Sequence, residues 1–289
     1  MKIKTKILNL IRTFFKISFL EKFIRNRVKG KSTDSFWAKW VPNNYQYPPN
    51  SMRTFAYKGV NLQLDIHDYV SHYLYFQFLD QSHLKLMSLV KKDAVVLDIG
   101  TNYGTTILQF AQLVGEAGLC FGFEPDPINF KICQENLRLN HFKNIQVENC
   151  GLGHVAGTFE LVVDTASNRG GNRIGIDSVG KETHQVSVVP LDDWIKDKNL
   201  TKVDLIKIDV EGYEMNVLKG AKEMLQKFKP MLFIELDDSN LKLQGSSSKE
   251  LVSFLTFLGY GIQHAENKQV ILETDPFEGT HFDVVCKVG

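Results

Sequence analysis

The sequence lacks several patterns that mark common classes of protein. Its four cysteines, Cys120, Cys133, Cys150 and Cys286, are far apart and form no Cys-x-x-Cys pair, which favours reduced, buried thiols in a cytoplasmic protein. The eight histidines show no His-Glu-x-x-His or similar spacing, so we expect no bound metal ion. The sequence also has no apolar run that approaches the roughly 20 residues of a membrane-spanning helix.

Acidic residues are nearly absent from the first part of the chain. The 289 residues carry a formal net charge of +1, but residues 1–31 contain ten lysines or arginines and a single acid, Glu21. Apolar residues recur there at helical spacing, which predicts a basic amphipathic helix with a break near Ser18. Arg12 and Lys16 interrupt the apolar core of an export signal, so we expect no cleavage and export.

The basic helix has two interpretations. It can lie on an anionic membrane surface through its lysines and its Phe and Ile side chains, as a peripheral contact at the inner face of the membrane. Alternatively, the same face packs on the main domain or on a second subunit. An aromatic linker rich in turn-forming residues follows. We therefore predict an extension over residues 1–52 and a main domain over residues 53–289.

Strand-like and helix-like runs alternate through the main domain, which predicts an α/β fold with a mostly parallel sheet and helices on both faces. The strand-like runs are 94–99, 119–124, 145–149, 158–163, 185–190, 203–209, 230–236, 258–264 and 281–287. The helix-like runs are 104–114, 127–140, 213–228 and 247–257.

Residues 164–184 interrupt this alternation with a polar, glycine-rich segment. We expect a flexible loop near the active edge of the sheet, with Asn172 and Arg173 as candidate substrate contacts. A plain surface loop is the alternative.

The stretch from Val95 to Gly104 predicts a ligand site, because an apolar strand ends in Asp98 and glycines follow. The spacing of Gly100 and Gly104 fits neither the dinucleotide fingerprint nor a Walker A loop. An acid at this position would repel a pyrophosphate, whereas it suits S-adenosylmethionine, which carries a sulfonium and an ammonium and no phosphate. Glu124 ends the next strand, where an acid commonly pairs with ribose hydroxyls. The alternative is an empty turn with capping acids.

A second chemical stretch runs from Val203 to Glu214, where an apolar strand delivers Asp209 and Glu211 to the carboxyl edge of the sheet. This strand should lie beside the first one, across the topological switch point. Asp209 would then face the methyl donor, either as a general base toward an acceptor hydroxyl or as a negative wall near the sulfonium. Glu211 would orient an acceptor or brace the turn. Glu235, at the end of the following strand, lines the acceptor side or makes a structural pair.

Together these stretches resemble the FkbM-type methyltransferase family over roughly residues 55–289. The resemblance implies a dependence on S-adenosylmethionine, a seven-stranded Rossmann-like sheet of class I, and action on hydroxyl oxygens of sugars, polyketide-type products or other small metabolites. The motifs that carry it are Val96-Leu97-Asp98-Ile99-Gly100-Thr101-Asn102-x-Gly104, Phe123-Glu124-Pro125, Asn149-Cys150-Gly151-Leu152-Gly153 and Lys207-Ile208-Asp209-Val210-Glu211-Gly212-Tyr213-Glu214.

The resemblance also assigns roles by position. Asp98, Gly100, Asn102 and Gly104 match the cofactor loop, Glu124 the ribose-binding acid, Asn149 the turn toward the adenine, and Asp209 the acid after the fourth strand. The sequence departs from the family pattern at Thr101, where alanine is usual.

Two other functions remain open from the sequence alone. One is methylation of RNA, although the chain lacks the Asn/Asp-Pro-Pro-Tyr motif after this strand, and its core has no long basic stripe with aromatics. We therefore expect no nucleic-acid partner. The other is a non-catalytic cofactor-binding module that docks on a membrane or a partner through residues 1–50.

Overall fold

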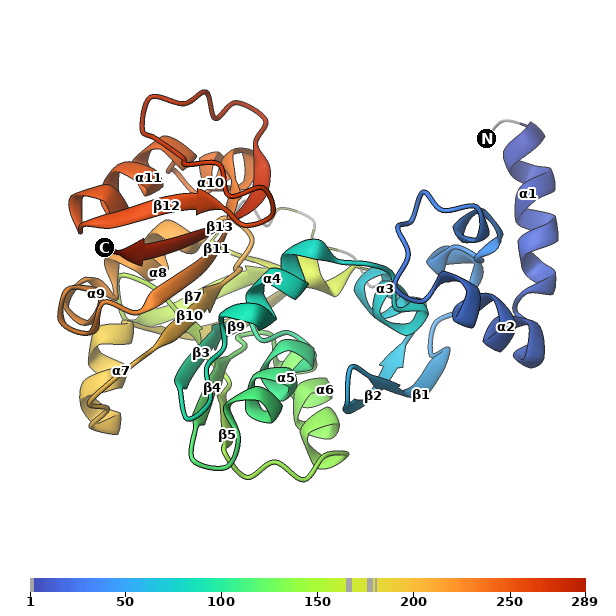
Figure 1. Ribbon diagram of the computed structural model, residues 1–289, viewed down its shortest axis with the longest axis horizontal. Coiled ribbons are helices and arrows are strands. Elements are labelled where there is room, and N and C mark those ends of the chain that lie inside the picture. Colours follow the sequence, from blue (N-terminus) through green and yellow to red (C-terminus); the bar gives the residue numbers. More distant parts are fainter. Residues whose placement is uncertain (1–2, 165–167, 176–178, 180) are drawn as a thin grey trace. The chain divides into compact units, whose positions relative to one another are not determined.

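The computed structural model describes residues 3–164, 168–175, 179 and 181–289 and is shown in Figure 1. Its described residues form two compact units. The N-terminal unit contains residues 3–81 and 168–170, and the C-terminal unit contains the rest. The domain boundary expected at residue 52 stays a prediction.

The N-terminal unit consists of short helices around a β-hairpin. Its elements are α1 (Ile3–Phe14), α2 (Ser18–Val28), the 3₁₀ helices η1 (Trp37–Trp40) and η2 (Asn44–Gln46), β1 (Met52–Tyr57), β2 (Val60–Asp65) and α3 (Tyr69–Phe76). The predicted helical break near Ser18 is confirmed. The hairpin turn places Lys58 and Gly59 at positive φ, as a tight two-residue connection requires.

Glu21, the single acid of the basic segment, holds this unit together. Its buried carboxylate receives Arg53 Nε at 2.8 Å and the Tyr75 hydroxyl at 2.8 Å. It therefore joins α2 to the hairpin and to α3. A buried charge with both a cation and a hydroxyl partner is well satisfied.

The C-terminal unit contains the predicted seven-stranded, mostly parallel sheet, in the order β12-β13-β11-β10-β3-β4-β5. β13 runs antiparallel to both of its neighbours, and the other pairs are parallel. The strands are β3 (Val95–Ile99), β4 (Leu119–Phe123), β5 (Ile145–Glu148), β10 (Leu205–Ile208), β11 (Met231–Asp237), β12 (Tyr260–His264) and β13 (His281–Val288).

Two of the predicted strand-like runs, 158–163 and 185–190, belong to a separate four-stranded sheet in the order β6-β9-β7-β8. Its strands are β6 (Gly151–Leu152), β7 (Gly157–Val162), β8 (Arg173–Ile174) and β9 (Thr183–Val189).

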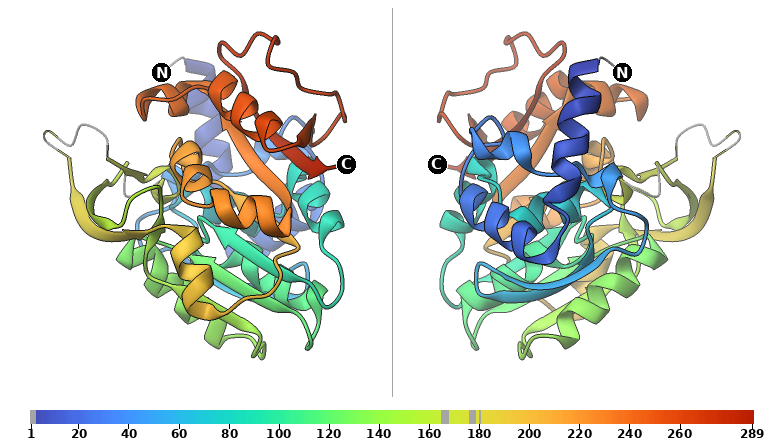
Figure 2. Two further views of the ribbon diagram at one scale, coloured as in Figure 1. Left: turned by 90° about the vertical axis from the view of Figure 1, so that its left-hand side faces the viewer. Right: turned by 90° about the vertical axis from the view of Figure 1, so that its right-hand side faces the viewer.

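Helices cover both faces of the main sheet, because successive residues of its strands point to opposite sides. In β3, Val95, Leu97 and Ile99 belong to one hydrophobic core, and Val96 belongs to the other. The first core is completed by α7 (Leu191–Lys198), α8 (Glu214–Lys219), α9 (Lys222–Phe228), α10 (Asp238–Leu243) and α11 (Ser248–Phe257). The second is completed by α4 (Gln81–Leu89), α5 (Thr105–Val114) and α6 (Pro127–Arg138). Figure 2 shows the sheet and its helices from two further sides.

The structure corrects two details. The predicted helix over 213–228 is two helices, interrupted where Gly220 packs against Gly153, since a Cβ on Gly220 would lie 2.0 Å from the Gly153 carbonyl oxygen. The predicted loop over 164–184 contains a 3₁₀ turn, η3 (Arg169–Gly171), and the short strand β8, which pairs with β7. Its residues 165–167, 176–178 and 180 lie outside the described part of the chain.

All four cysteines are free thiols, three of them buried and Cys150 partly exposed. No helix within the described residues has the length and apolar character that crossing a membrane demands.

Candidate active site

The carboxyl ends of β3 and β10 lie side by side at the switch point, as the sequence predicts. The register pairs Asp98 with Lys207, which places both side chains on the same face of the sheet. Lys207 Nζ lies 3.1 Å from Asp209 Oδ2 and 3.6 Å from Asp98 Oδ1, and it donates to the Gly100 carbonyl at 2.9 Å. One buried ammonium therefore joins the turn after β3 to two acids.

Lys207 has no assigned role in the sequence interpretation, although it is the charged residue of an otherwise apolar strand. Burial by itself lowers the pKa of its ammonium, but the carboxylates of Asp209 and Asp98 outweigh that effect and raise the pKa. The group is therefore a fixed positive charge beneath the edge of the sheet.

Asp98 is completely buried, with 0% of its surface exposed. Among the described residues, neither of its carboxylate oxygens has a hydrogen-bond partner. Burial raises the pKa of this carboxyl to about 6, against the opposing effect of Lys207. Asp98 thus retains hydrogen-bonding capacity that the surrounding protein leaves unused.

The turn after β3 requires its glycines. Gly100 has a φ of +84°, and a Cβ there would lie 1.9 Å from the Asp209 carbonyl oxygen. Gly104 has a φ of +85°, with Cys133 Sγ 2.8 Å from a Cβ position. Asn102 adopts the left-handed conformation at φ 50°, and its buried Oδ1 has no hydrogen-bond partner among the described residues. The turn therefore offers unpaired acceptors on a tightly fixed backbone.

The hydrogen bonds of Thr101 account for the threonine at this position, where the family usually has alanine. Its hydroxyl donates to the Asp98 carbonyl at 2.8 Å and accepts from the Phe123 amide at 3.0 Å. It therefore ties the turn to β4 with a pair of hydrogen bonds that alanine cannot make.

Glu124 lies at the end of β4 and faces the same turn. Its buried carboxylate accepts from the amides of Asn102 at 2.8 Å and Asp126 at 2.9 Å. Burial raises the pKa of Glu124 to about 7, although both amides favour the charged form. Asn149 donates to the carbonyls of Glu124 and Pro125 at 2.9 and 3.2 Å. The predicted residues of this half of the edge are thus brought together.

Three acids cluster at the ends of β10 and β11. Carboxylate oxygens of Asp209, Glu211 and Glu235 all lie within 4.8 Å of one another. Burial, followed by Asp209, raises the pKa of Glu211 to about 7. Burial and the neighbouring Asp209 and Glu211 also raise the pKa of Glu235. The three acids therefore repel one another when ionised, and each favours the protonated form of its neighbours.

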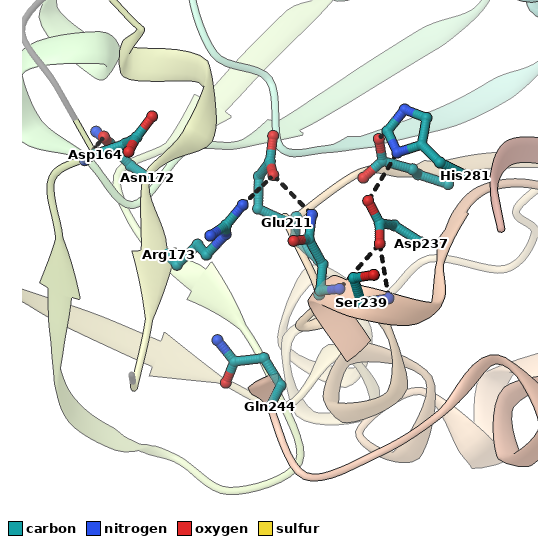
Figure 3. A network of polar contacts seen from close by, with 12 residues as sticks. Asp164, Asn172, Arg173, Glu211, Asp237, Ser239, Gln244 and His281 are labelled. Atoms are coloured by element: carbon teal, nitrogen blue, oxygen red, sulfur yellow. Dashed lines mark hydrogen bonds and ion pairs between the residues drawn. The ribbon is translucent and has the colours of Figure 1, made fainter. Parts of the chain in front are cut away.

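Hydrogen bonds fix Glu211 from two sides. Its Oε2 accepts from Arg173 Nη2 at 3.4 Å and from Asn240 Nδ2 at 3.2 Å, and Figure 3 shows Arg173 pointing at this carboxylate. The buried Glu214 braces the turn by accepting from the Val210 and Gly212 amides, both at 3.1 Å.

The two candidates from the glycine-rich segment differ in position. Arg173 reaches the acids from β8, whereas Asn172 accepts from the Asp164 amide at 3.0 Å and donates to Asp126. The structure therefore brings Arg173 into the cluster and directs Asn172 toward the start of α6.

A hollow of about 310 Å³ lies next to the acids, and its lining residues are Glu235, His264, Glu266, His281, Phe282 and Asp283. Because β13 is antiparallel to β11, its first residues lie at the same edge, with Asp283 opposite Glu235 and His281 opposite Asp237. Sequence reasoning did not identify His264 and His281. Their position at the ends of strands that face this edge would have indicated them.

Comparison with known families gives one model that spans more than half of the chain. The model described as "Methyltransferase FkbM domain" matches residues 98–262. A second model, for protein-L-isoaspartate(D-aspartate) O-methyltransferase, matches residues 30–156.

Several curated proteins are similar to this chain. The 2-O-methyltransferase NoeI of Sinorhizobium fredii is 32% identical over 178 residues, which cover 55% of this chain and 70% of NoeI. Methyltransferase 1 of Beauveria bassiana is 30% identical, over 51% of this chain and 66% of that protein. The hexuronic acid methyltransferase AglP of Haloferax volcanii is 27% identical, over 49% and 55%. The matches therefore span between about half and 70% of these relatives.

Among solved structures, the methyltransferase FkbM of Methylobacillus flagellatus is 20% identical with a TM-score of 0.43, over 67% of this chain and 44% of that one.

Proposed function

The chain belongs to the FkbM family of methyltransferases, whose methyl donor is S-adenosylmethionine, and from this premise we propose that it methylates a hydroxyl oxygen of a sugar, a glycan or another small metabolite. The observation that carries the proposal is the pair of acids Asp98 and Asp209 on either side of Lys207 at the switch point. Relatives named as 2-O- and hexuronic acid methyltransferases support an oxygen acceptor of this kind.

The residues at the ends of β3 and β4 fit the cofactor. The oxygens of Asp98 and Asn102 that lack a hydrogen-bond partner are acceptors suited to its ammonium. Each Glu124 oxygen holds one backbone amide and retains lone pairs for a ribose hydroxyl. Gly100 and Gly104 keep the backbone open to a ligand, and Asn149 borders the position proposed for the adenine.

The ends of β10 and β11 supply the catalytic groups of this proposal. The bound cofactor provides an electrophilic methyl carbon, and attack by oxygen is an in-line displacement in which positioning of the two reactants is the main task. Asp209, held by Lys207, forms a negative wall beside the sulfonium. Glu211, held by Arg173 and Asn240, orients the acceptor, and Glu235 lines its side of the site.

Transfer of labelled methyl groups tests this function. Purified protein and S-adenosylmethionine with a tritiated methyl group are added to a cell extract, and we expect label in small molecules or glycans, each heavier by one CH₂. Glu148→Ala at the end of β5 serves as a matched control that keeps activity, and Glu124→Ala should lose activity when the cofactor is below saturation. Label that disappears after nuclease treatment would instead identify RNA as the acceptor. Cofactor binding without any transfer would support the non-catalytic module.

We also propose that α1 contacts the cytoplasmic face of an anionic membrane. Ile7, Leu10, Ile11 and Phe14 lie at helical spacing and are between 37% and 66% exposed. The opposite side of the helix carries polar residues, and it is this side that bonds to its own unit. Those contacts are Asn9 to the Tyr45 hydroxyl and Arg12 to the Lys39 carbonyl, and in the turn after α1 Lys16 donates to the Gln46 carbonyl.

An apolar stripe turned outward among basic residues suits a surface of anionic lipid. In vesicle flotation, the full chain should bind vesicles that contain phosphatidylserine and should not bind vesicles of phosphatidylcholine. The variant Leu10→Asp should lose binding, whereas Asn26→Asp on α2 adds the same charge and should keep binding. Equal binding by all three proteins contradicts the proposal.

A further inference from the structure

The hollow beside the acid cluster has no role in the function proposed so far. We propose that it receives the methyl acceptor, that His281 removes the proton from the reacting hydroxyl, and that the acceptor is a sugar ring without an acidic group. This inference rests on the proposed methyltransferase function and adds to it a base and a substrate class.

The hollow is continuous with the proposed catalytic edge through Glu235. This residue lines the hollow, and its carboxylate lies within 4.8 Å of Asp209 and Glu211 oxygens. From the other side, His281 Nε2 lies 3.8 Å from Glu235 Oε1. A sugar ring bound in the hollow would therefore have a hydroxyl between the imidazole of His281 and Asp209, the acid proposed to face the methyl donor.

Asp237 fixes the orientation of His281. Its Oδ2 lies 2.7 Å from His281 Nδ1, and its Oδ1 accepts from the amides of Ser239 and Asn240, both at 2.9 Å. Figure 3 shows Asp237 between His281 and Ser239. With Nδ1–H donated to Asp237, the neutral imidazole keeps its lone pair on Nε2. That nitrogen is on the side of Glu235 and the hollow, where an acceptor hydroxyl would lie.

The acids of the cluster are less suited to accept the proton. Asp209 Oδ2 is engaged by Lys207, and Glu211 Oε2 is engaged by Arg173 and Asn240. The Glu235 carboxyl has a raised pKa through burial and its acidic neighbours, so it is a hydrogen-bond donor rather than a base at neutral pH. His281 combines an oriented lone pair with access to the hollow.

The proton and electron balance of the step is complete. The acceptor hydroxyl gives its proton to Nε2, and its oxygen forms a bond to the methyl carbon. The bond between that carbon and sulfur breaks, and its electron pair stays on the sulfur, which becomes neutral. Asp237 and Glu235 flank the resulting imidazolium, and because the side chain of His281 is 66% exposed it can release the proton to water.

The lining of the hollow selects against an acidic acceptor. Besides the protonated Glu235, the lining contains the carboxylates of Glu266 and Asp283, so a carboxylate on the ligand would be repelled. His264 and Phe282 stack with centroids 4.6 Å apart and planes 24° apart, which supplies an apolar surface for the C–H face of a sugar. The carboxyl groups can accept hydrogen bonds from its hydroxyls. This chain should therefore differ in acceptor from a hexuronic acid methyltransferase such as AglP.

The first experiment measures methyl transfer into cell extract with tritium-labelled cofactor. His281→Gln should lower the rate by about 10²–10⁴-fold, the usual contribution of a general base, with cofactor affinity unchanged by calorimetry. Asp237→Asn should lower it less, and the exposed His141→Gln is the matched control.

The outcomes separate the two proposals. Transfer by the wild type with an undiminished rate in His281→Gln overturns the base assignment and leaves the methyltransferase function intact. No transfer by the wild type overturns both. The labelled product is then hydrolysed to monosaccharides and separated by anion exchange. Label in a neutral or amino sugar supports the inference, whereas label in a uronic acid or outside the sugars overturns the substrate class.

Discussion

The two halves of the carboxyl edge are built differently. At the ends of β3 and β4, Glu124 is satisfied by backbone amides, and the turn depends on glycines at positive φ. At the ends of β10 and β11, Asp209, Glu211 and Glu235 face one another, and their partners are side chains.

This difference indicates which half of the edge can change easily by substitution and which half cannot. Backbone hydrogen bonds and close backbone contacts can change only if the turn refolds, which suits a ligand that never changes. Side-chain pairs can be altered one residue at a time, which suits an acceptor that differs between relatives. We therefore assign the first half to the cofactor and the second half to the acceptor, and the following predictions test that division.

The largest effect is expected in the second half. Asp209→Asn weakens the ion pair with Lys207 and the acid cluster that position the two reactants, and should lower kcat by about 10²-fold, the usual cost of misplaced reacting groups. Calorimetric affinity for the cofactor should stay close to that of the wild type. The exposed Asp197→Asn on α7 is the control, and an unchanged kcat in Asp209→Asn would remove Asp209 from the catalytic groups.

Gly100→Ala tests the rigidity of the first half. The new methyl group would overlap the Asp209 carbonyl oxygen, so we expect a loss of about 3 kcal/mol of unfolding free energy and of cofactor binding. Gly279→Ala has a similar φ of +70° and open space around it, and should cost only about 1 kcal/mol. Chemical denaturation measures both, and equal losses would show that backbone contact at Gly100 is unimportant.

Glu124→Ala should affect cofactor binding more than chemistry. Loss of the ribose acceptor and of the bonds to Asn102 and Asp126 should weaken cofactor affinity by about 10–100-fold. Saturating cofactor should restore most of kcat. Unaltered affinity in a calorimetric titration would refute the role of Glu124.

The smallest effect is a pH dependence of cofactor affinity. The pKa values of Asp98 and Glu124 are raised to about 6 and 7 by burial, so both carboxyls take up protons near pH 6 in the free protein. A cationic ligand favours their ionised forms, so binding should release protons and affinity should rise from about pH 5 to pH 7. Titrations at pH 6 in two buffers of different ionisation enthalpy measure this release. A pH-independent affinity would place the cation elsewhere.

The same shifts predict the sign of a stability change in the free protein. Because the folded state holds these protons above the ordinary pKa of each acid, their stabilising contribution is complete below about pH 4 and is lost as pH rises through 6–7. Glu124→Gln, which cannot ionise, should reduce this decline in unfolding free energy.

Local sequence patterns were sufficient for much of this structure. Short apolar runs located β3, β4, β10 and β11, and the acids that end them lie together because parallel strands share a carboxyl edge. Local patterns do not show which distant segments contact one another. Lys207 acquires its role from its register with Asp98, and His281 acquires its role from the reversed direction of β13. The break at Gly220 depends on contact with Gly153, 67 positions earlier, which no local pattern reveals.

The antiparallel direction of β13 makes the hairpin of β12 and β13 an exchangeable part. Both strands sit at the border of the sheet, beyond the cofactor half, yet they contribute His264, His281 and Asp283 to the hollow. A graft of residues 260–288 from another family member would thus exchange one acceptor preference for another without disturbing the methyl donor, which gives protein engineers a compact segment for redirecting this chemistry.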